Sequence, residues 1–191
     1  MISYLLAGPA EEPVTLAEAK AWLKVDGADE DPLIGTLITA ARLHLESITG
    51  RALLTQSWRL VLDAWPAAGE VQLPVAPLSA LTAIRAFDED GDEHAIGLAQ
   101  FLVEAGGTPA RLVLPGTVAG MPVLRQRFGI EIDYVAGFGE AADVPQELKQ
   151  ALLVLVAHWF EHRDAVVIAG SGAVIPFGFD RLIAPWREVR L

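Results

Sequence analysis

The sequence contains no cysteine among its 191 residues. Disulfide bonds, thiolate metal sites and cysteine nucleophiles are therefore excluded, and a reducing compartment is the simplest setting for the protein. Long hydrophobic runs are also missing, since the longest, Ala151–Ala157, falls far short of the ~20 residues that a membrane-spanning helix needs. The first residues, MISYLLAGPAEEP, lack the basic region that begins a signal peptide. We expect cytoplasmic synthesis and no membrane association.

Several sequence patterns that accompany catalysis are absent. The chain has no G-x-x-x-x-G-K or G-x-G-x-x-G pattern, so no phosphate-binding loop is indicated. It also lacks a G-x-S-x-G elbow, which leaves acyl transfer by a serine nucleophile without a candidate. We expect no cofactor and no catalytic residue.

Basic side chains are scarce. Fourteen Lys and Arg stand against 25 Asp and Glu, which gives a net charge of −11. Residues 1–50 and 51–142 carry −5 each, and residues 143–191 only −1. An acidic surface repels phosphate, so double-stranded DNA should pass such a protein without binding to it. Taken alone, the charge favours a surface that only maintains solubility.

The first part of the chain carries signals for two helices. Thr15 followed by Glu18 forms a capping box, which predicts a helix from about Leu16 to Val25. Asp31 as N-cap with Pro32 in the first helical position predicts a second start. Apolar residues then recur at three- and four-residue steps as far as Gly50: Leu33, Ile34, Leu37, Ile38, Ala41, Leu45 and Ile48.

Residues 55–140 change to the two-residue period of β-strands. Short runs such as WRLVL, VQLPV, LTAIRAF, FLVEA, RLVLP and GIEIDYV are separated by Pro, Gly and Asp-Gly, which predicts about six strands. Asp90-Gly91 suits a tight hairpin turn because both residue types tolerate positive φ.

A third long helix begins near Pro145, with Asp143 or Val144 as its cap. Its expected buried stripe consists of Leu148, Ala151, Leu152, Leu155, Val156 and Trp159. The Gly170-Ser171-Gly172 segment then interrupts the chain before an apolar and basic tail.

These patterns together predict an α+β fold. Its helical core has three to four helices and consists of residues 1–54 and 141–172. Residues 55–140 form an inserted sandwich- or barrel-like β unit, and residues 173–191 form a flexible C-terminal tail.

Two short motifs suggest metal sites. His158-Trp159-Phe160-Glu161-His162 fits the H-x-x-E-H pattern of inverted zinc peptidases, although a third protein ligand is needed. A packed or interface histidine pair is the favoured interpretation. The acidic run from Asp88 to Glu93 fails the register of an EF-hand calcium loop and indicates a solvated hairpin. We expect no bound metal.

Nearly the whole chain resembles the long-form head–tail connector, or adaptor, family of tailed bacteriophages and gene transfer agents. The resemblance rests on Leu73-Pro74 with Pro77-Leu78, Phe87-Asp88 with Asp90-Gly91, Ala136-Gly137-Phe138-Gly139, the VPQELKQALLVLVAHWFEHRD helix and the segment from Pro176 to Arg187. It implies a non-enzymatic virion protein, made in the host bacterial cytoplasm, that forms a ring at the head–tail junction. The ring, usually a dodecamer, binds beneath the portal protein after DNA packaging, meets a stopper or tail-terminator protein and lets double-stranded DNA pass.

The resemblance also implies sites on this chain. The tail is expected to dock on the portal through its aromatic, apolar and basic side chains: Phe177, Phe179, Arg181, Leu182, Ile183, Trp186, Arg187 and Arg190. Ring or core contacts are expected from Trp159, Phe160, His158 and His162. Two alternatives remain open, namely a zinc-dependent hydrolase that uses the histidine motif and a free-standing protein-binding module.

Overall fold

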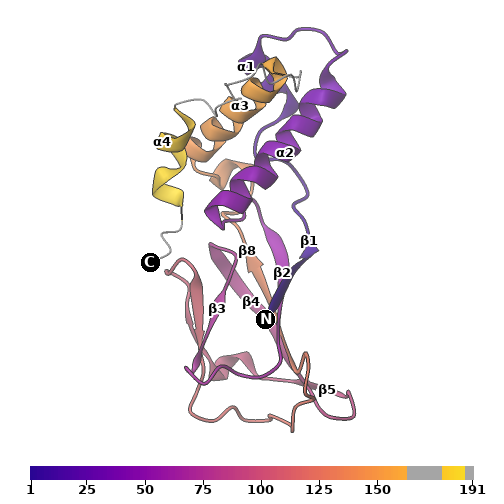
Figure 1. Cartoon of the computed structure of the whole chain (residues 1–191), viewed down its shortest axis with the longest axis vertical. Coiled ribbons are helices and arrows are strands. Elements are labelled where there is room, and N and C mark those ends of the chain that lie inside the picture. Colours follow the sequence, from indigo (N-terminus) through magenta and orange to yellow (C-terminus); the bar gives the residue numbers. More distant parts are fainter. Residues whose placement is uncertain (163–177, 188–191) are drawn as a thin grey trace, which may run out of the picture. The chain divides into compact units, whose positions relative to one another are not determined.

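The structure, a computed structural model, describes residues 1–162 and 178–187. Two compact units make up the chain. One, called the β unit below, combines Met1–Pro9 with Thr55–Phe138. The other, called the helical unit, combines Ala10–Leu54 with Gly139–Leu191. Four α-helices and two antiparallel sheets within the described residues confirm the predicted α+β class (Figure 1).

The β unit contains eight strands in two sheets. The five-stranded sheet has the order β1-β2-β8-β4-β5, and the three-stranded sheet has the order β3-β7-β6. All neighbours in both sheets run antiparallel. The strands are β1 (Ile2–Ala7), β2 (Gln56–Leu62), β3 (Glu70–Leu73), β4 (Leu78–Phe87), β5 (Glu93–Ala95), β6 (Leu102–Glu104), β7 (Ala110–Val113) and β8 (Ile130–Ala136).

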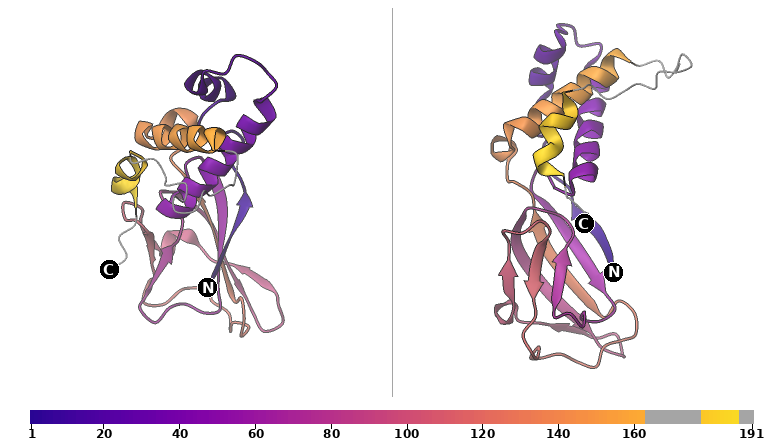
Figure 2. Two further views of the ribbon diagram at one scale, coloured as in Figure 1. Left: turned by 45° about the horizontal axis from the view of Figure 1, so that its top comes forward. Right: turned by 60° about the vertical axis from the view of Figure 1, so that its left-hand side comes forward.

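The two sheets bury the residues that the two-residue period places inside. Figure 2 shows the sheets as two layers of one unit. Ile132 and Tyr134 of β8 and Leu112 of β7 have no exposed surface. The expected hairpin joins β4 to β5, with Phe87 opposite Glu93 and Gly91 at φ 90°. Here glycine avoids the steric cost that other residues meet at positive φ.

The first residues correct one expectation. The assignment of residues 1–54 to the helical core is wrong for Ile2–Ala7, because this segment forms β1 and pairs with β2 from Ile2 opposite Val61 to Ala7 opposite Ser57. The run ISYLLA shows neither clear alternation nor a helical period. Its conformation is therefore specified by a partner strand about fifty residues away rather than by its own pattern.

The helical unit contains α1 (Leu16–Leu23), α2 (Asp31–Thr49), α3 (Gln146–Glu161) and α4 (Phe179–Ile183). The capping box of α1 is confirmed: the Thr15 amide donates to Glu18 Oε2 at 2.7 Å, and the Glu18 amide donates to Thr15 Oγ1 at 3.2 Å. Each of these orphan amides thus gains a partner at the helix start. Short 3₁₀ turns precede α3 (Ala141–Asp143) and follow α4 (Ala184–Trp186), and another lies in the β unit (Leu98–Gln100).

Two predicted helix caps are displaced. Asp31 is the first residue of α2 rather than its cap, since Glu30 occupies the N-cap position without a side-chain bond. The carboxylate of Asp31 instead accepts a hydrogen bond from Lys20 Nζ at 2.6 Å. Pro145, rather than Asp143 or Val144, precedes α3. A charged partner on α1 therefore competes successfully for the Asp31 side chain.

The core of the helical unit follows the predicted apolar stripes. On α3, Leu148, Ala151, Leu152, Leu155 and Val156 are buried, whereas Trp159 is only half-buried. The guanidinium of Arg42 on α2 lies largely buried and donates to Glu12 at 2.7 Å and to Glu46 at 3.0 Å. Over residues 1–162 and 178–187, every helix is too short or too polar to traverse a bilayer.

Candidate functional site

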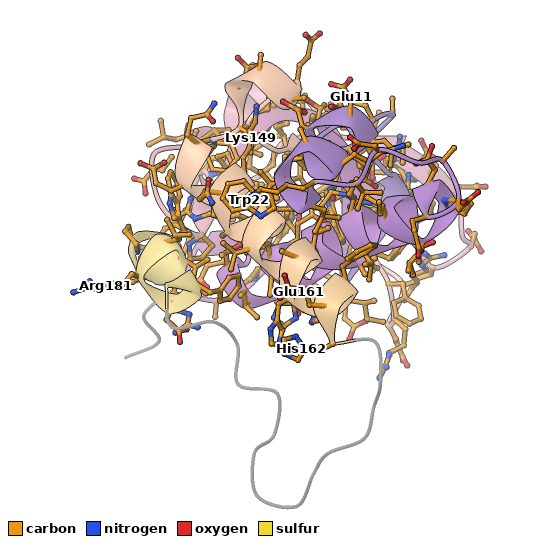
Figure 3. All side chains as sticks on the ribbon, turned by 90° about the horizontal axis from the view of Figure 1, so that it is seen from above. Glu11, Trp22, Lys149, Glu161, His162 and Arg181 are labelled. Carbon is orange, nitrogen blue, oxygen red and sulfur yellow. The ribbon has the colours of Figure 1, made fainter. Side chains whose placement is uncertain are left out.

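The histidine motif occupies the last turn of α3. The rings of His158 and His162 stack with centroids 4.5 Å apart, and His162 Nδ1 lies 2.8 Å from the His158 carbonyl oxygen. Figure 3 labels Glu161 and His162 at this end of the helix, and both are exposed. Burial, with a smaller effect from the neighbouring His162, lowers the pKa of His158.

This arrangement does not assemble a zinc site in the described part of the chain. No group of three or more His, Cys, Asp or Glu side chains suited to a metal ion occurs among residues 1–162 and 178–187. One ring nitrogen of His162 is already within hydrogen-bond distance of a backbone oxygen. A catalytic zinc requires three protein ligands and an open fourth position. The geometry supports the interpretation of the motif as a packed pair at a helix end.

An aromatic cluster joins three helices of the unit. The ring of His44 on α2 makes an edge contact with Trp159 on α3, with centroids 5.9 Å apart. It also lies 6.4 Å from the ring of Phe179 on α4. His44 falls between the expected core positions of α2, so the apolar period alone gives no signal for it. The cluster connects α4 to both long helices.

The segment around α4 contains most of the predicted docking residues. Phe179 and Ile183 are fully buried, and Leu182 is half-buried. Arg181 is exposed and points away from the helix (Figure 3). In the single chain, the apolar side of α4 therefore belongs to the core of the helical unit.

The 3₁₀ turn after α4 is held by arginine contacts. Arg51 Nε donates to the Trp186 carbonyl oxygen at 3.2 Å, and the Arg51 guanidinium lies 5.4 Å from the centre of the indole. Arg187 pairs with Asp180 at 2.6 Å, and both side chains are exposed. Of the remaining expected docking residues, Phe177 and Arg190 lie outside the described residues. Phe160, one of the expected ring contacts, is half-buried.

The acidic hairpin of the β unit is organised by its own first residue. Asp88 Oδ1 accepts hydrogen bonds from the amides of Asp90 at 3.1 Å and Asp92 at 2.9 Å. Its Oδ2 lies 2.6 Å from His94 Nε2, and this hydrogen bond is the main reason why the pKa of Asp88 is lowered. The turn is therefore a self-contained acidic loop, in agreement with the solvated hairpin that the sequence predicts.

A line of charged side chains crosses the five-stranded sheet. Arg59 of β2 pairs with Asp133 at 2.6 Å and with Glu131 at 2.8 Å, both on β8. Arg85 of β4 pairs with the same Asp133 at 2.6 Å and with Glu93 at 3.3 Å. Burial acts to raise the pKa of Asp133, but the hydrogen bonds from Arg59 and Arg85 hold it below its usual range. No periodicity in the sequence reveals this charged ladder, because it depends on strand register.

The surface of the described residues includes exposed Arg181 and Arg187 at α4, a histidine pair of which His162 is exposed and His158 is half-buried, and the acidic hairpin.

The chain matches the family described as head completion protein over residues 12–175. This chain belongs to that family. The head completion protein family match begins after β1, spans most of both units and ends before α4. No curated protein matches the chain significantly.

Solved structures of gene transfer agent (GTA) particles contain chains with the same fold. A chain in the neck of an empty GTA particle, computed with C6 symmetry, is 28% identical with a TM-score of 0.84, and the match covers 100% of this chain and 97% of that chain. A chain in the virion of the native particle is 27% identical with a TM-score of 0.81. A third, in the native neck computed with C12 symmetry, is 28% identical with a TM-score of 0.78. The latter two matches have the same coverage as the first.

Proposed function

We propose that this head completion protein is the subunit of a ring-shaped head–tail connector of a bacteriophage or gene transfer agent. The ring joins the portal of the head to the tail, and double-stranded DNA passes through its lumen. The observation that carries the proposal is the similarity to a GTA neck chain over 100% of this chain and 97% of that chain. A structural role without catalysis is part of the proposal and is supported by the head completion protein family.

The proposed assembly is a homo-oligomeric ring, with twelve copies as the favoured number. The related necks were computed with C12 and C6 symmetry. A cyclic ring requires two different, complementary surfaces on each subunit, because head-to-tail contacts are heterologous. The histidine pair and the half-buried Trp159 and Phe160 at the end of α3 are proposed to contribute to ring or core packing.

The portal is the proposed partner of the α4 segment. Arg181 and Arg187 present positive charge in a chain of net charge −11, and Trp186 and Leu182 retain partial exposure. Phe179 and Ile183 reach a portal groove only if α4 leaves the helical unit. Phe177 and Arg190 complete the proposed set. Ordering or transferring such a segment costs roughly 2–5 kcal/mol, which favours docking on a preassembled ring with many grooves.

The acidic charge fits passage of DNA without adhesion. Basic clusters on this chain would bind phosphate and hold the genome through release of counterions. An acidic surface instead leaves the duplex free to move. The downstream partner is proposed to be a stopper or tail-terminator protein.

The proposal is tested by imaging the purified chain mixed with portal rings or with DNA-filled heads that lack a neck. Capped portals with cyclic symmetry are expected. The double variant Arg181→Glu/Arg187→Glu should lose capping, whereas Arg127→Glu, at a 75% exposed side chain of the β unit, should retain it. A stable monomer that ignores portals would instead favour a free-standing binding module.

The zinc hydrolase alternative receives no support from the family match. Elemental analysis of untagged protein should find well under one zinc per chain. Stoichiometric zinc that disappears in His158→Ala would contradict the structural role.

A further inference from the structure

The β1 strand forms an unprotected edge of the five-stranded sheet. The strand order of this sheet places β1 at one end, so among residues 1–162 and 178–187 only one side of β1 is paired. Ile2, Leu5 and Leu6 are each 45–50% exposed, and no charged residue occurs before Glu11. Soluble proteins usually protect an edge with charges, proline or a covering loop, because its free amides and carbonyls pair readily with another strand. The exposed edge of β1 is therefore available for pairing with another strand.

A second free edge lies on β4. This strand has ten residues, but β5 pairs only with its last three, Arg85–Phe87. The Ile96 amide, just after β5, donates to the Ile84 carbonyl oxygen at 2.9 Å, and the 3₁₀ turn Leu98–Gln100 lies close to β4. The six residues before Ile84, Leu78–Ala83, pair with β8 on one side and with no strand of the described chain on the other. This six-residue segment contains no charge, and its Ser79, Ala80 and Thr82 are exposed.

The two edges match in length, polarity and chemistry. β1 has six residues, as has the free segment of β4. Since β1, β2, β8 and β4 alternate in direction, β1 of one copy runs antiparallel to β4 of a second copy when the two sheets continue side by side. Both segments are uncharged, so no ion is desolvated when the strands pair.

We infer that β1 of one subunit pairs with the free segment of β4 in the next subunit, so that the five-stranded sheets join edge to edge around the ring. This inference rests on the proposed connector function, since it supplies the contact that closes the ring. Two unlike edges satisfy the requirement for a heterologous contact, whereas pairing of β1 with another β1 produces a two-fold dimer and no ring.

Bulges make this contact selective. β4 departs from regular register with β8 at Ser79 and at Thr82, and β1 departs from regular register with β2 at Leu6. Bulges bend and twist a strand and so hinder the flat pairing that leads to fibres. A bent β1 edge pairs best with a strand of matching curvature. In this inference, that strand is the bulged β4 of the next subunit rather than a flat strand of an unrelated protein.

Paired cysteines test the contact directly, because the chain has no cysteine of its own. Counted without the bulge at Thr82, an antiparallel register with Ile2 opposite Ala83 places Leu5 opposite Ala80. Within one copy these two residues lie three strand spacings apart, about 14 Å, which exceeds the roughly 7 Å limit between Cα atoms of a disulfide. A disulfide in the Leu5→Cys/Ala80→Cys variant therefore joins two copies.

The double variant should form a ladder of covalent oligomers on portal-bound rings after mild oxidation, visible on a non-reducing gel. Each single variant should remain monomeric. Leu5→Cys/Val123→Cys serves as the matched control, because Val123 is 73% exposed and its neighbour Leu124 bridges Asp88, beyond the end of β4 opposite to the free segment.

The outcomes separate this inference from the proposed function. Rings that cap portals without cross-linking in the double variant would overturn the edge pairing while leaving the connector function intact. Dimers formed by Leu5→Cys alone would overturn it in favour of β1–β1 pairing. Cross-linked oligomers that ignore portals would support the edge pairing and contradict the portal docking. A double variant that shows no capping and no cross-linking would contradict both the edge pairing and the connector function.

Discussion

The two units differ in the exposure of the apolar side chains that are proposed to make contacts. In the helical unit, Phe179 and Ile183 of α4 are buried in the core and have no exposed surface. In the β unit, the apolar side chains of β1 stand at 45–50% exposure along an open sheet edge. The proposed docking of α4 therefore requires the helical unit to rearrange, whereas the proposed edge pairing requires no rearrangement of the β unit.

This difference suggests two levels of control over assembly. A contact that is always available suits the neighbouring copy, which is identical and abundant. The proposed contact of α4 first requires Phe179 and Ile183 to leave the core. Such a contact suits a partner that should be bound only after its ring is complete, as is proposed for the portal. Variants that disturb one unit and spare the other test this division.

The largest expected effect is that of Phe179→Ala. The substitution removes a fully buried aromatic side chain and its contact with His44, which should lower the free energy of unfolding of the helical unit by about 3–5 kcal/mol. Urea unfolding followed by circular dichroism at 222 nm measures the loss. Leu102→Ala, at a 62% exposed site in the β unit, is the control and should change stability by less than about 0.5 kcal/mol. Equal effects of the two variants would show that α4 is not part of the core.

The second prediction concerns the charged ladder of the β unit. Asp133→Asn leaves Arg59 and Arg85 without their shared carboxylate, which should cost about 2–3 kcal/mol at neutral pH. Because the folded state lowers the pKa of Asp133, its contribution is complete above about pH 4 and is lost as the pH falls through the folded value.

Wild type and Asp133→Asn should consequently become more similar in stability as the solution is acidified below pH 4. Thermal unfolding across that range measures the convergence, with Glu104→Gln at an exposed strand position as the control. A stability gap that persists unchanged into acid would contradict a role for the Asp133 charge.

The sequence predicts the local elements of this protein far better than it predicts their partners. The α1 capping box and the buried stripe of α3 are encoded by residues a few positions apart, and both are confirmed except at Trp159. The strand β1 and the ladder through Asp133 depend on neighbours about 50 to 75 residues away, so no local period reveals them. The burial of Phe179 and Ile183 depends likewise on packing against α3, which composition alone cannot show.

A smaller effect is expected at the start of α1. Thr15→Ala removes the hydroxyl that caps this helix, which should destabilise the helical unit by about 1 kcal/mol. The hydrogen bonds from Thr15 also lower the pKa of Glu18, so the variant should raise the pKa of that carboxyl towards its ordinary value. Nuclear magnetic resonance titration of Glu18 measures the change. Because α4 is untouched, portal capping should persist, and loss of capping would contradict the assignment of docking to α4.

The proposed portal docking requires α4 to leave the helical unit without unfolding that unit. Single cysteines at two fully buried positions, Ile183→Cys on α4 and Ala151→Cys on α3, make this measurable as the rate of thiol labelling of the native protein. We expect Ile183→Cys to be labelled at least about tenfold faster than Ala151→Cys, because a five-residue helix without a side-chain cap opens locally. Equal labelling rates, with both thiols reached only by unfolding of the whole unit, would contradict it.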